Sequence, residues 1–100
     1  MMFAVWAIDR PGVLADRERV REAHRARLRD PGRHPVHVLL AGPLLDDAAG
    51  TMGGSLLVVE AEDIDAVRAY VDGDPYVAAG VYDRVEVRPW RCGLGPLAAG

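Results

Sequence analysis

A chain of 100 residues with 50% hydrophobic side chains is long enough for one packed domain and too apolar for a disordered segment. Its net charge of −3 argues against a nucleic-acid-binding protein, and its basic residues are all arginine, which excludes a Schiff-base mechanism. The longest apolar run, around residues 36–45, is too short to span a membrane. A single cysteine, Cys92, and no signal peptide together predict a cytoplasmic protein.

Residues 2–8 are predicted to form a strand, and because both of its faces are apolar this strand should be central in a sheet. After a turn at residues 9–12, a helix is expected over residues 16–29 and should end at the Asp-Pro-Gly of residues 30–32. At about 100° per residue, His24 lies on the side of this helix that faces inward or lines a groove. That side carries Val20, Ala23, His24, Arg27 and Leu28, whereas Arg21, Arg25 and Arg29 lie further round.

A second strand is expected over residues 36–41, ended by a turn at Gly42 and Pro43, with a loop over residues 44–54. The third strand, residues 55–61, is again apolar on both faces and should also be central.

A second helix should follow a cap at Glu62 or Asp63 and end at Gly73. Its inward stripe consists of Ile64, Val67, Tyr70 and Val71.

The next segment is predicted to be a short helix. Asp74 stands before Pro75, which suits an N-cap followed by the first helical position, and Gly80 ends the turn. Residues 82–90 alternate between apolar and charged side chains, which is typical of an edge strand or a strand with one wet face, and residues 91–100 form a tail.

The element order is βαββαβ with a small helical insert, which predicts an α+β ferredoxin-like domain over residues 1–90 with a four-stranded antiparallel sheet. Two helices can cover only one face of that sheet, yet the first and third strands are apolar on both faces. We therefore expect a second copy of the chain on the other face, in a homodimer or a higher oligomer built from it.

A histidine and a carboxylate are the candidates for chemistry. His24 can give or take a proton near neutral pH, and Asp74 can hold one ring nitrogen so that the other faces a substrate. The simpler alternatives stay open, with Asp74 acting only as a helix cap and His24 packed in the core. Their spacing in sequence does not say whether they meet.

Further residues are candidates for the same pocket. Ser55 either binds a substrate oxygen or satisfies a strand end, and Gly42 with Pro43 is most simply a turn. Arg27 either holds a substrate carboxylate or phenolate or forms a surface salt bridge, and Tyr76 either donates to a ligand or packs the insert.

No cofactor or metal is implied by the sequence. The His-x-x-His of His34 and His37 is interrupted by Pro35 and has no clear third ligand, and Asp46 and Asp47 are expected to be solvated. A Gly-rich phosphate-binding loop is also missing from the sequence.

Five segments spread over the chain carry a family resemblance. They are residues 24–28 (His-Arg-Ala-Arg-Leu), 41–43 (Ala-Gly-Pro), 54–55 (Gly-Ser), 74–82 (Asp-Pro-Tyr-Val-Ala-Ala-Gly-Val-Tyr), and the pattern Val85, Val87, Pro89, Trp90. On these residues, of which the Asp-Pro-Tyr block is the specific one, the chain resembles the YciI-like family of small bacterial proteins.

The resemblance implies a ferredoxin-like fold that dimerises into an α/β barrel, with an active site centred on His24 and Asp74. One relative is a dehydrochlorinase acting on a chlorinated hydroxyhydroquinone, and muconolactone isomerases share the barrel. An elimination or isomerisation by proton transfer on a small organic, including cyclic, substrate is therefore the leading hypothesis. The loop at residues 44–53 is short for the family, which implies a reshaped pocket mouth.

Two rival functions stay open. One is a non-catalytic dimeric module that binds a small molecule or serves another protein as an accessory, and the other is a cofactor-free oxygenase of the same barrel type. Separation of the His24 ring from the Asp74 carboxylate, or a ring with no opening to solvent, would favour the binding module.

Overall fold

The computed structural model describes residues 1–30, 32–48 and 50–98, and contains four strands and three helices. In chain order they are β1 (Met2–Asp9), α1 (Leu14–Arg29), β2 (His37–Leu45), β3 (Met52–Glu60), α2 (Ile64–Asp72), α3 (Pro75–Ala78) and β4 (Tyr82–Pro89). Pro31, in the expected helix end, and residues 99–100 of the expected tail lie outside the described residues.

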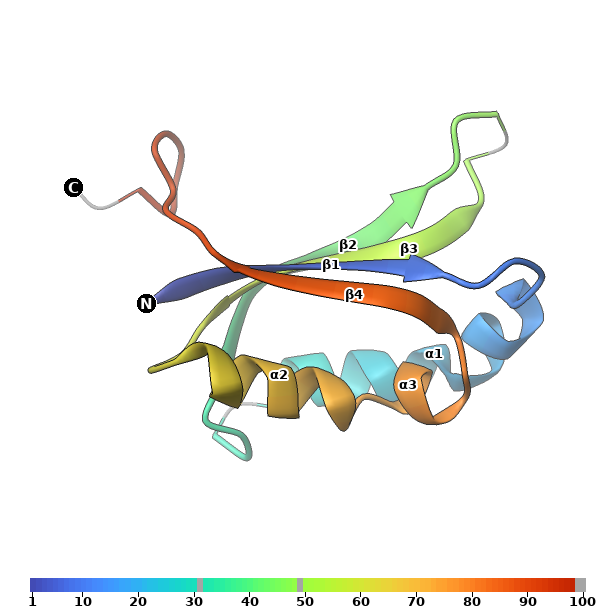
Figure 1. The fold of residues 1–100 in the computed structure, drawn as a ribbon, viewed down its shortest axis with the longest axis horizontal. Coiled ribbons are helices and arrows are strands. Elements are labelled where there is room, and N and C mark those ends of the chain that lie inside the picture. The colour runs from blue at the N-terminus through green and yellow to red at the C-terminus, as the bar shows by residue number, and fades with distance from the viewer. Residues whose placement is uncertain (31, 49, 99–100) are drawn as a thin grey trace.

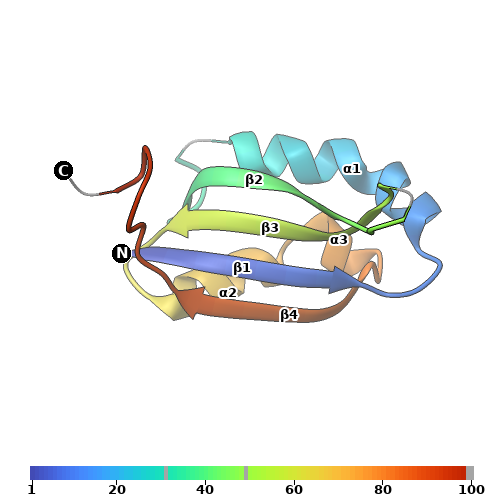
Figure 2. The same cartoon turned by 90° about the horizontal axis from the view of Figure 1, so that it is seen from above.

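The four strands form one antiparallel sheet in the order β2-β3-β1-β4 (Figure 2). The two strands that are apolar on both faces, β1 and β3, are central, and the alternating strand β4 lies at an edge, as the sequence predicts. In the register, Val5 of β1 stands opposite Leu57 of β3 and Val87 of β4. The predicted α+β ferredoxin-like arrangement is therefore confirmed.

All three helices cover the same face of the sheet (Figure 1). The core between the layers is formed by buried side chains of β1, β3 and α2, including Phe3, Val5, Leu57, Val59, Val67, Tyr70 and Val71. Asp63 caps α2 by accepting a hydrogen bond from the backbone N–H of Ala66 at 2.8 Å, and Gly73 is its C-cap. These local signals fix the position of α2, and with it the start of α3 only three residues later.

The turn expected at Gly42 and Pro43 is wrong. Both residues lie inside β2, where they pair with Leu56 and Ser55 of β3, so the hairpin extends further than expected at both strands. Gly42 does not adopt a positive φ, and a proline is tolerated here because β2 is an edge strand whose outer N–H groups need no partner. The extension lengthens the part of β2 that faces α1.

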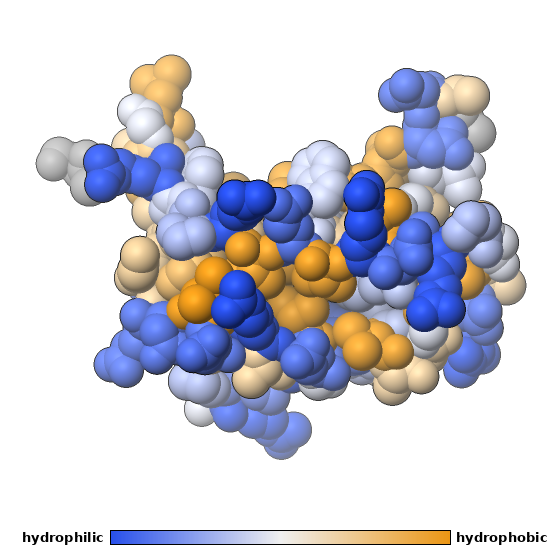
Figure 3. Space-filling view, in the orientation of Figure 1, coloured by the Kyte–Doolittle hydropathy of each residue, from blue (hydrophilic) through white to orange (hydrophobic). Residues whose placement is uncertain are grey.

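The sheet face opposite the helices keeps large apolar side chains at its surface. Trp6, Leu40 and Leu56 are 47%, 54% and 38% exposed. The end of the β2–β3 hairpin and the segment after β4 both project on this side of the sheet (Figure 1). The space-filling view shows a hollow between these two projections (Figure 3). Among the described residues, no helix has the length and hydrophobicity needed to cross a bilayer.

Candidate active site

The short helix α3 begins as the sequence predicts. Asp74 has extended backbone angles, its Oδ1 accepts a hydrogen bond from the Tyr76 N–H at 2.9 Å, and Pro75 occupies the first helical position. The carboxylate is thus held in one orientation by its own helix. Asp74 is only 4% exposed, so any charge it carries needs a nearby partner.

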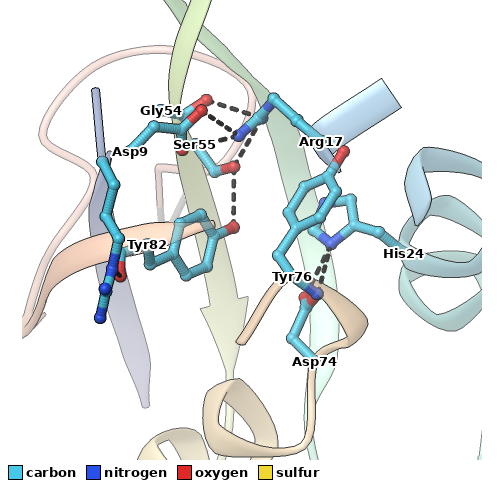
Figure 4. A network of polar contacts seen from close by, with 9 residues as sticks. Asp9, Arg17, His24, Gly54, Ser55, Asp74, Tyr76 and Tyr82 are labelled. Atoms are coloured by element: carbon cyan, nitrogen blue, oxygen red, sulfur yellow. Dashed lines mark hydrogen bonds and ion pairs between the residues drawn. The ribbon is translucent and has the colours of Figure 1, made fainter. Parts of the chain in front are cut away.

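That partner is His24 of α1. Its Nδ1 lies 2.7 Å from Asp74 Oδ2 and 2.9 Å from Oδ1, and both side chains are buried (Figure 4). The structure therefore brings together the two residues proposed as a pair from sequence. Since a carboxylate accepts the Nδ1 proton, the neutral ring carries its lone pair on Nε2, for which the described residues offer no hydrogen-bond partner.

Tyr76 packs against this pair. Its ring stacks on the His24 ring with centroids 4.0 Å apart and planes 17° from parallel, and only 1% of the residue is exposed. Burial raises the pKa of the Tyr76 phenol above its ordinary value. The packing alternative for Tyr76 is thus supported by the contacts, and the ring fixes one face of the imidazole.

Arg17 is a site residue that the sequence analysis missed. Its Nη1 donates to both carboxylate oxygens of Asp9 at 2.9 and 3.1 Å, and its Nη2 donates to the Gly54 carbonyl at 2.7 Å and to Ser55 Oγ at 2.9 Å (Figure 4). The guanidinium also lies 4.5 Å from the centroid of the Tyr76 ring. Burial raises the pKa of the Asp9 carboxyl, and the positive charge of Arg17 opposes that rise.

A signal for Arg17 was present in the sequence. Arg17 precedes His24 by seven residues, which is close to two helical turns, so both point to the same side of α1. An arginine on the face of a helix that packs inward needs a buried counter-ion, and here Asp9 supplies it.

The contacts of Ser55 leave its hydroxyl proton free to be donated in a hydrogen bond. Its Oγ accepts from Arg17 Nη2 and from the Tyr82 hydroxyl, the latter at 2.8 Å. Burial raises the pKa of the Tyr82 phenol well above its ordinary value of 10.0, so this hydroxyl keeps its proton and donates. Two accepted hydrogen bonds use both lone pairs of the serine, which leaves the Ser55 proton for another acceptor.

These groups meet at one cleft between α1 and β2, with a volume of about 360 Å³. Its walls include five of the expected side chains and backbone positions: His24, Gly42, Pro43, Ser55 and Tyr76. Four arginines of α1 also line it, namely Arg17, Arg21, Arg25 and Arg29. The last three were placed further round the helix than His24, yet they border the same cleft.

Arg27, expected as a substrate ligand or a surface ion pair, is engaged elsewhere. Its guanidinium donates to the Tyr70 carbonyl and lies 4.2 Å from the centroid of the Tyr70 ring. A side chain at Gly73 would meet Arg27 Nη2 at 2.7 Å, so this glycine leaves room for the arginine. Arg27 therefore ties α1 to α2 and is not among the residues that line the cleft.

Within the described residues, the structure contains no cluster of three or more His, Cys, Asp or Glu side chains able to hold a metal ion. His34 packs edge-on against the Tyr70 ring at 5.1 Å, and His37 lies in β2. Asp46 accepts from the Ala48 N–H at 3.2 Å in the β2–β3 turn.

Comparison with known proteins agrees with this architecture. Residues 1–91 match the model of the YCII-related domain. The chain is 40% identical over 99 residues to Protein YciI of Escherichia coli O6:H1, covering 91% of this chain and 97% of that protein. It is 35% identical over 96 residues to an uncharacterized protein of Haemophilus influenzae, with the same coverage.

Among solved structures, it superposes with a TM-score of 0.82 on TftG, the 5-chloro-2-hydroxyhydroquinone dehydrochlorinase of Burkholderia phenoliruptrix AC1100, in complex with 2,5-dihydroxybenzoquinone. That pair is 34% identical, and the match covers 93% of this chain and 96% of TftG. The fold, the family model and the sequence identities agree, and this chain belongs to the YCII-related domain family.

Proposed function

We propose that this protein is a small enzyme that uses His24 to move a proton in an elimination or isomerisation of a small organic compound, including cyclic ones. The observation that carries the proposal is the position of His24, whose Nδ1 is held by Asp74 at 2.7 Å while the residue lines the cleft. A ring held in this way presents Nε2 as a base, and the carboxylate stabilises the imidazolium that forms.

The proposed reaction needs only groups of the chain. Nε2 of His24 takes a proton from a carbon next to a carbonyl, and the electron pair of that C–H bond moves into an enolate whose oxygen accepts the Ser55 proton in a hydrogen bond. In an elimination, the pair then returns to form a C=C bond as chloride or another anion leaves the adjacent carbon. In an isomerisation, the imidazolium returns the proton to a different carbon.

The similarity to TftG supports this reaction class. TftG removes chloride from a hydroxylated six-membered ring and was solved with a dihydroxybenzoquinone bound. A cleft of about 360 Å³ whose walls combine apolar side chains with polar groups accommodates a substituted six-membered ring. Gly42, Pro43 and Ser55 are the proposed substrate contacts on the β2–β3 side, and Tyr76 is a positioning residue for His24.

We further propose that two copies pair through the sheet face opposite the helices. The helices cover only one face, and Trp6, Leu40 and Leu56 remain exposed on the other. Exposed apolar side chains on three neighbouring strands of a sheet are typical of a protein–protein interface. The partner copy would shield these side chains without covering α1, which lies on the opposite face.

The experiment is a turnover assay on chlorinated hydroxyhydroquinones and related cyclic ketones, following chloride release and, in D₂O, deuterium incorporation by NMR. The wild type should turn over at least one compound that also raises its melting temperature, and His24→Ala should lose about 10²- to 10⁴-fold in rate while still binding it. Equal rates in wild type and His24→Ala would contradict the role proposed for His24, and binding without turnover in the wild type would leave a binding module.

A further inference from the structure

The cleft is lined by an unusual concentration of positive charge. Arginines follow α1 at intervals of four residues, at positions 17, 21, 25 and 29, and all four border the cleft. Residues four apart on a helix lie nearly one above the other, so the four side chains start from one stripe of α1. Among the described lining residues there is no aspartate or glutamate, although the whole chain has a net charge of −3.

The arginines differ in how they are neutralised. Arg17 is paired with Asp9 at 2.9 Å, and Arg25 lies 3.8 Å from Glu22. Arg21 is half-buried, and the described residues give it neither a carboxylate nor a hydrogen-bond acceptor. A partly desolvated cation without a counter-ion attracts an anion from solution more strongly than an exposed one.

The location of Arg21 matches the chemistry proposed for His24. It lies one turn from both Arg17 and His24 on α1, where side chains three and four residues apart are neighbours. Burial raises the pKa of the Tyr76 phenol, and the positive charges of Arg17 and Arg21 oppose that rise. An anionic group bound by Arg21 would therefore sit in the same cleft that His24 lines, one helical turn along α1 from the ring.

We infer that the cleft selects substrates that carry a negative charge, such as a carboxylate or a phenolate, and that Arg21 is the specificity-determining residue that binds this group. The inference rests on the proposed function only in taking this cleft as the substrate site. A bound anion at Arg21 would be positioned by two N–H groups of the guanidinium, and the same charge would stabilise an enolate formed in the ring.

The test uses a pair of probes with the same size and different charge, 2,5-dihydroxybenzoate and 2,5-dihydroxybenzamide, and measures dissociation constants by calorimetry at pH 7.5. The wild type should bind the carboxylate at least tenfold more tightly than the amide, and raising NaCl from 50 to 500 mM should reduce that preference. Arg21→Gln should remove the preference, Arg21→Lys should retain part of it, and Arg19→Gln should leave it unchanged. Arg19 is a matched control because it lies on the same helix, is exposed and does not line the cleft.

Equal affinity of the wild type for the two probes, binding of neither, or a preference that survives in Arg21→Gln would overturn the inference. The His24→Ala variant separates it from the proposed function. If His24→Ala keeps both full turnover and the carboxylate preference, the catalytic proposal fails and the charge selection stands. If His24→Ala loses turnover while the wild type shows no preference, the charge selection alone fails.

Discussion

Arg17 and His24, two turns apart on α1, both pack against the ring of Tyr76. The His24 ring stacks on it at 4.0 Å, and the Arg17 guanidinium lies 4.5 Å from its centroid. Through this ring the ion pair at the end of β1 and the histidine–carboxylate pair at α3 become parts of one rigid wall. Small changes at either pair should therefore be measurable at the other.

The role of Asp74 in orienting His24 can be tested separately from its role as the N-cap of α3. Asp74→Asn keeps a good N-cap for α3 but replaces the carboxylate that accepts the Nδ1 proton of His24. We expect the melting temperature to change little and turnover to fall by about 10²-fold or more, because the amide favours the wrong tautomer of the ring. Asp74→Ala, as a control, should lose turnover and also about 0.5–2 kcal/mol of stability from the cap. Full turnover of Asp74→Asn would rule out a positioning role for Asp74.

Removing Arg17 should destabilise the fold. Its side chain and that of Asp9 are 3% and 6% exposed, so Arg17→Met leaves a buried carboxylate without its counter-ion. We expect a loss of about 3–5 kcal/mol in urea unfolding, and a smaller loss when Asp9→Leu is added to the same chain. Arg19→Met, which removes an exposed pair with Asp16, should change stability by less than about 1 kcal/mol. A double variant that is less stable than Arg17→Met would contradict this account.

The burial of the tyrosine phenols should lower the stability of the fold at alkaline pH. Burial raises the pKa of Tyr70, Tyr76 and Tyr82 above 10.0, so the folded chain keeps protons that the unfolded chain releases near pH 10. Because the folded state then binds more protons, the free energy of unfolding should be constant just below pH 10 and fall as the pH rises above it. Absorbance at 295 nm should show phenolate at pH 10.5 in urea and little in the folded protein. Superimposable titrations of the two states would contradict the prediction.

The proposed dimer depends on the apolar face of the sheet. Trp6→Glu places a charge in the centre of that face, next to Leu56 in the neighbouring strand, and should convert a dimer into a monomer of about 10.8 kDa by light scattering. Leu14→Glu is the matched control, because Leu14 is also an exposed apolar residue but belongs to α1 on the other layer. A wild-type protein that is monomeric in dilute solution would contradict the proposed dimer.

Two adjacent glycines in β3 should respond differently to the same change. A methyl group at Gly54 would collide with the Ala7 carbonyl oxygen of β1, whereas one at Gly53 would meet nothing within 4 Å. Gly54→Ala should cost about 1–3 kcal/mol in unfolding free energy and displace the carbonyl that accepts from Arg17. Gly53→Ala should be nearly neutral. Similar stabilities for the two variants would show that the strands can shift apart freely.

The sequence was sufficient for the parts of this fold that local signals determine. Apolar residues on both faces identified β1 and β3 as the central strands, and the Asp-Pro pair at residues 74–75 located the start of α3. The meeting of His24 with Asp74 was proposed from the family resemblance rather than from spacing, because 50 residues separate them. Their contact depends on how α1 and α3 pack, which no local pattern encodes.

The predictions from sequence that were wrong or incomplete have a common physical cause, which is that tertiary contacts outweigh local preference. Gly42 and Pro43 usually mark a turn, but an edge strand tolerates both, and tertiary pairing with β3 prevailed over the local preference. Arg17 was overlooked because arginines are normally solvated, and its partners Asp9, Gly54 and Ser55 come from two other strands. Arg27 lies one turn from His24, yet contacts with Tyr70 of α2 draw it away from the cleft.

The proline in β2 also bears on how the chain behaves in crowded solution. An outer strand with a complete row of amide hydrogens is a template on which foreign strands polymerise into fibrils. Pro43 lacks one of those hydrogens and interrupts the row at one end of the stretch of β2 that lines the cleft. The edge of β2 beside the cleft is therefore a poorer template for self-association than an edge without a proline.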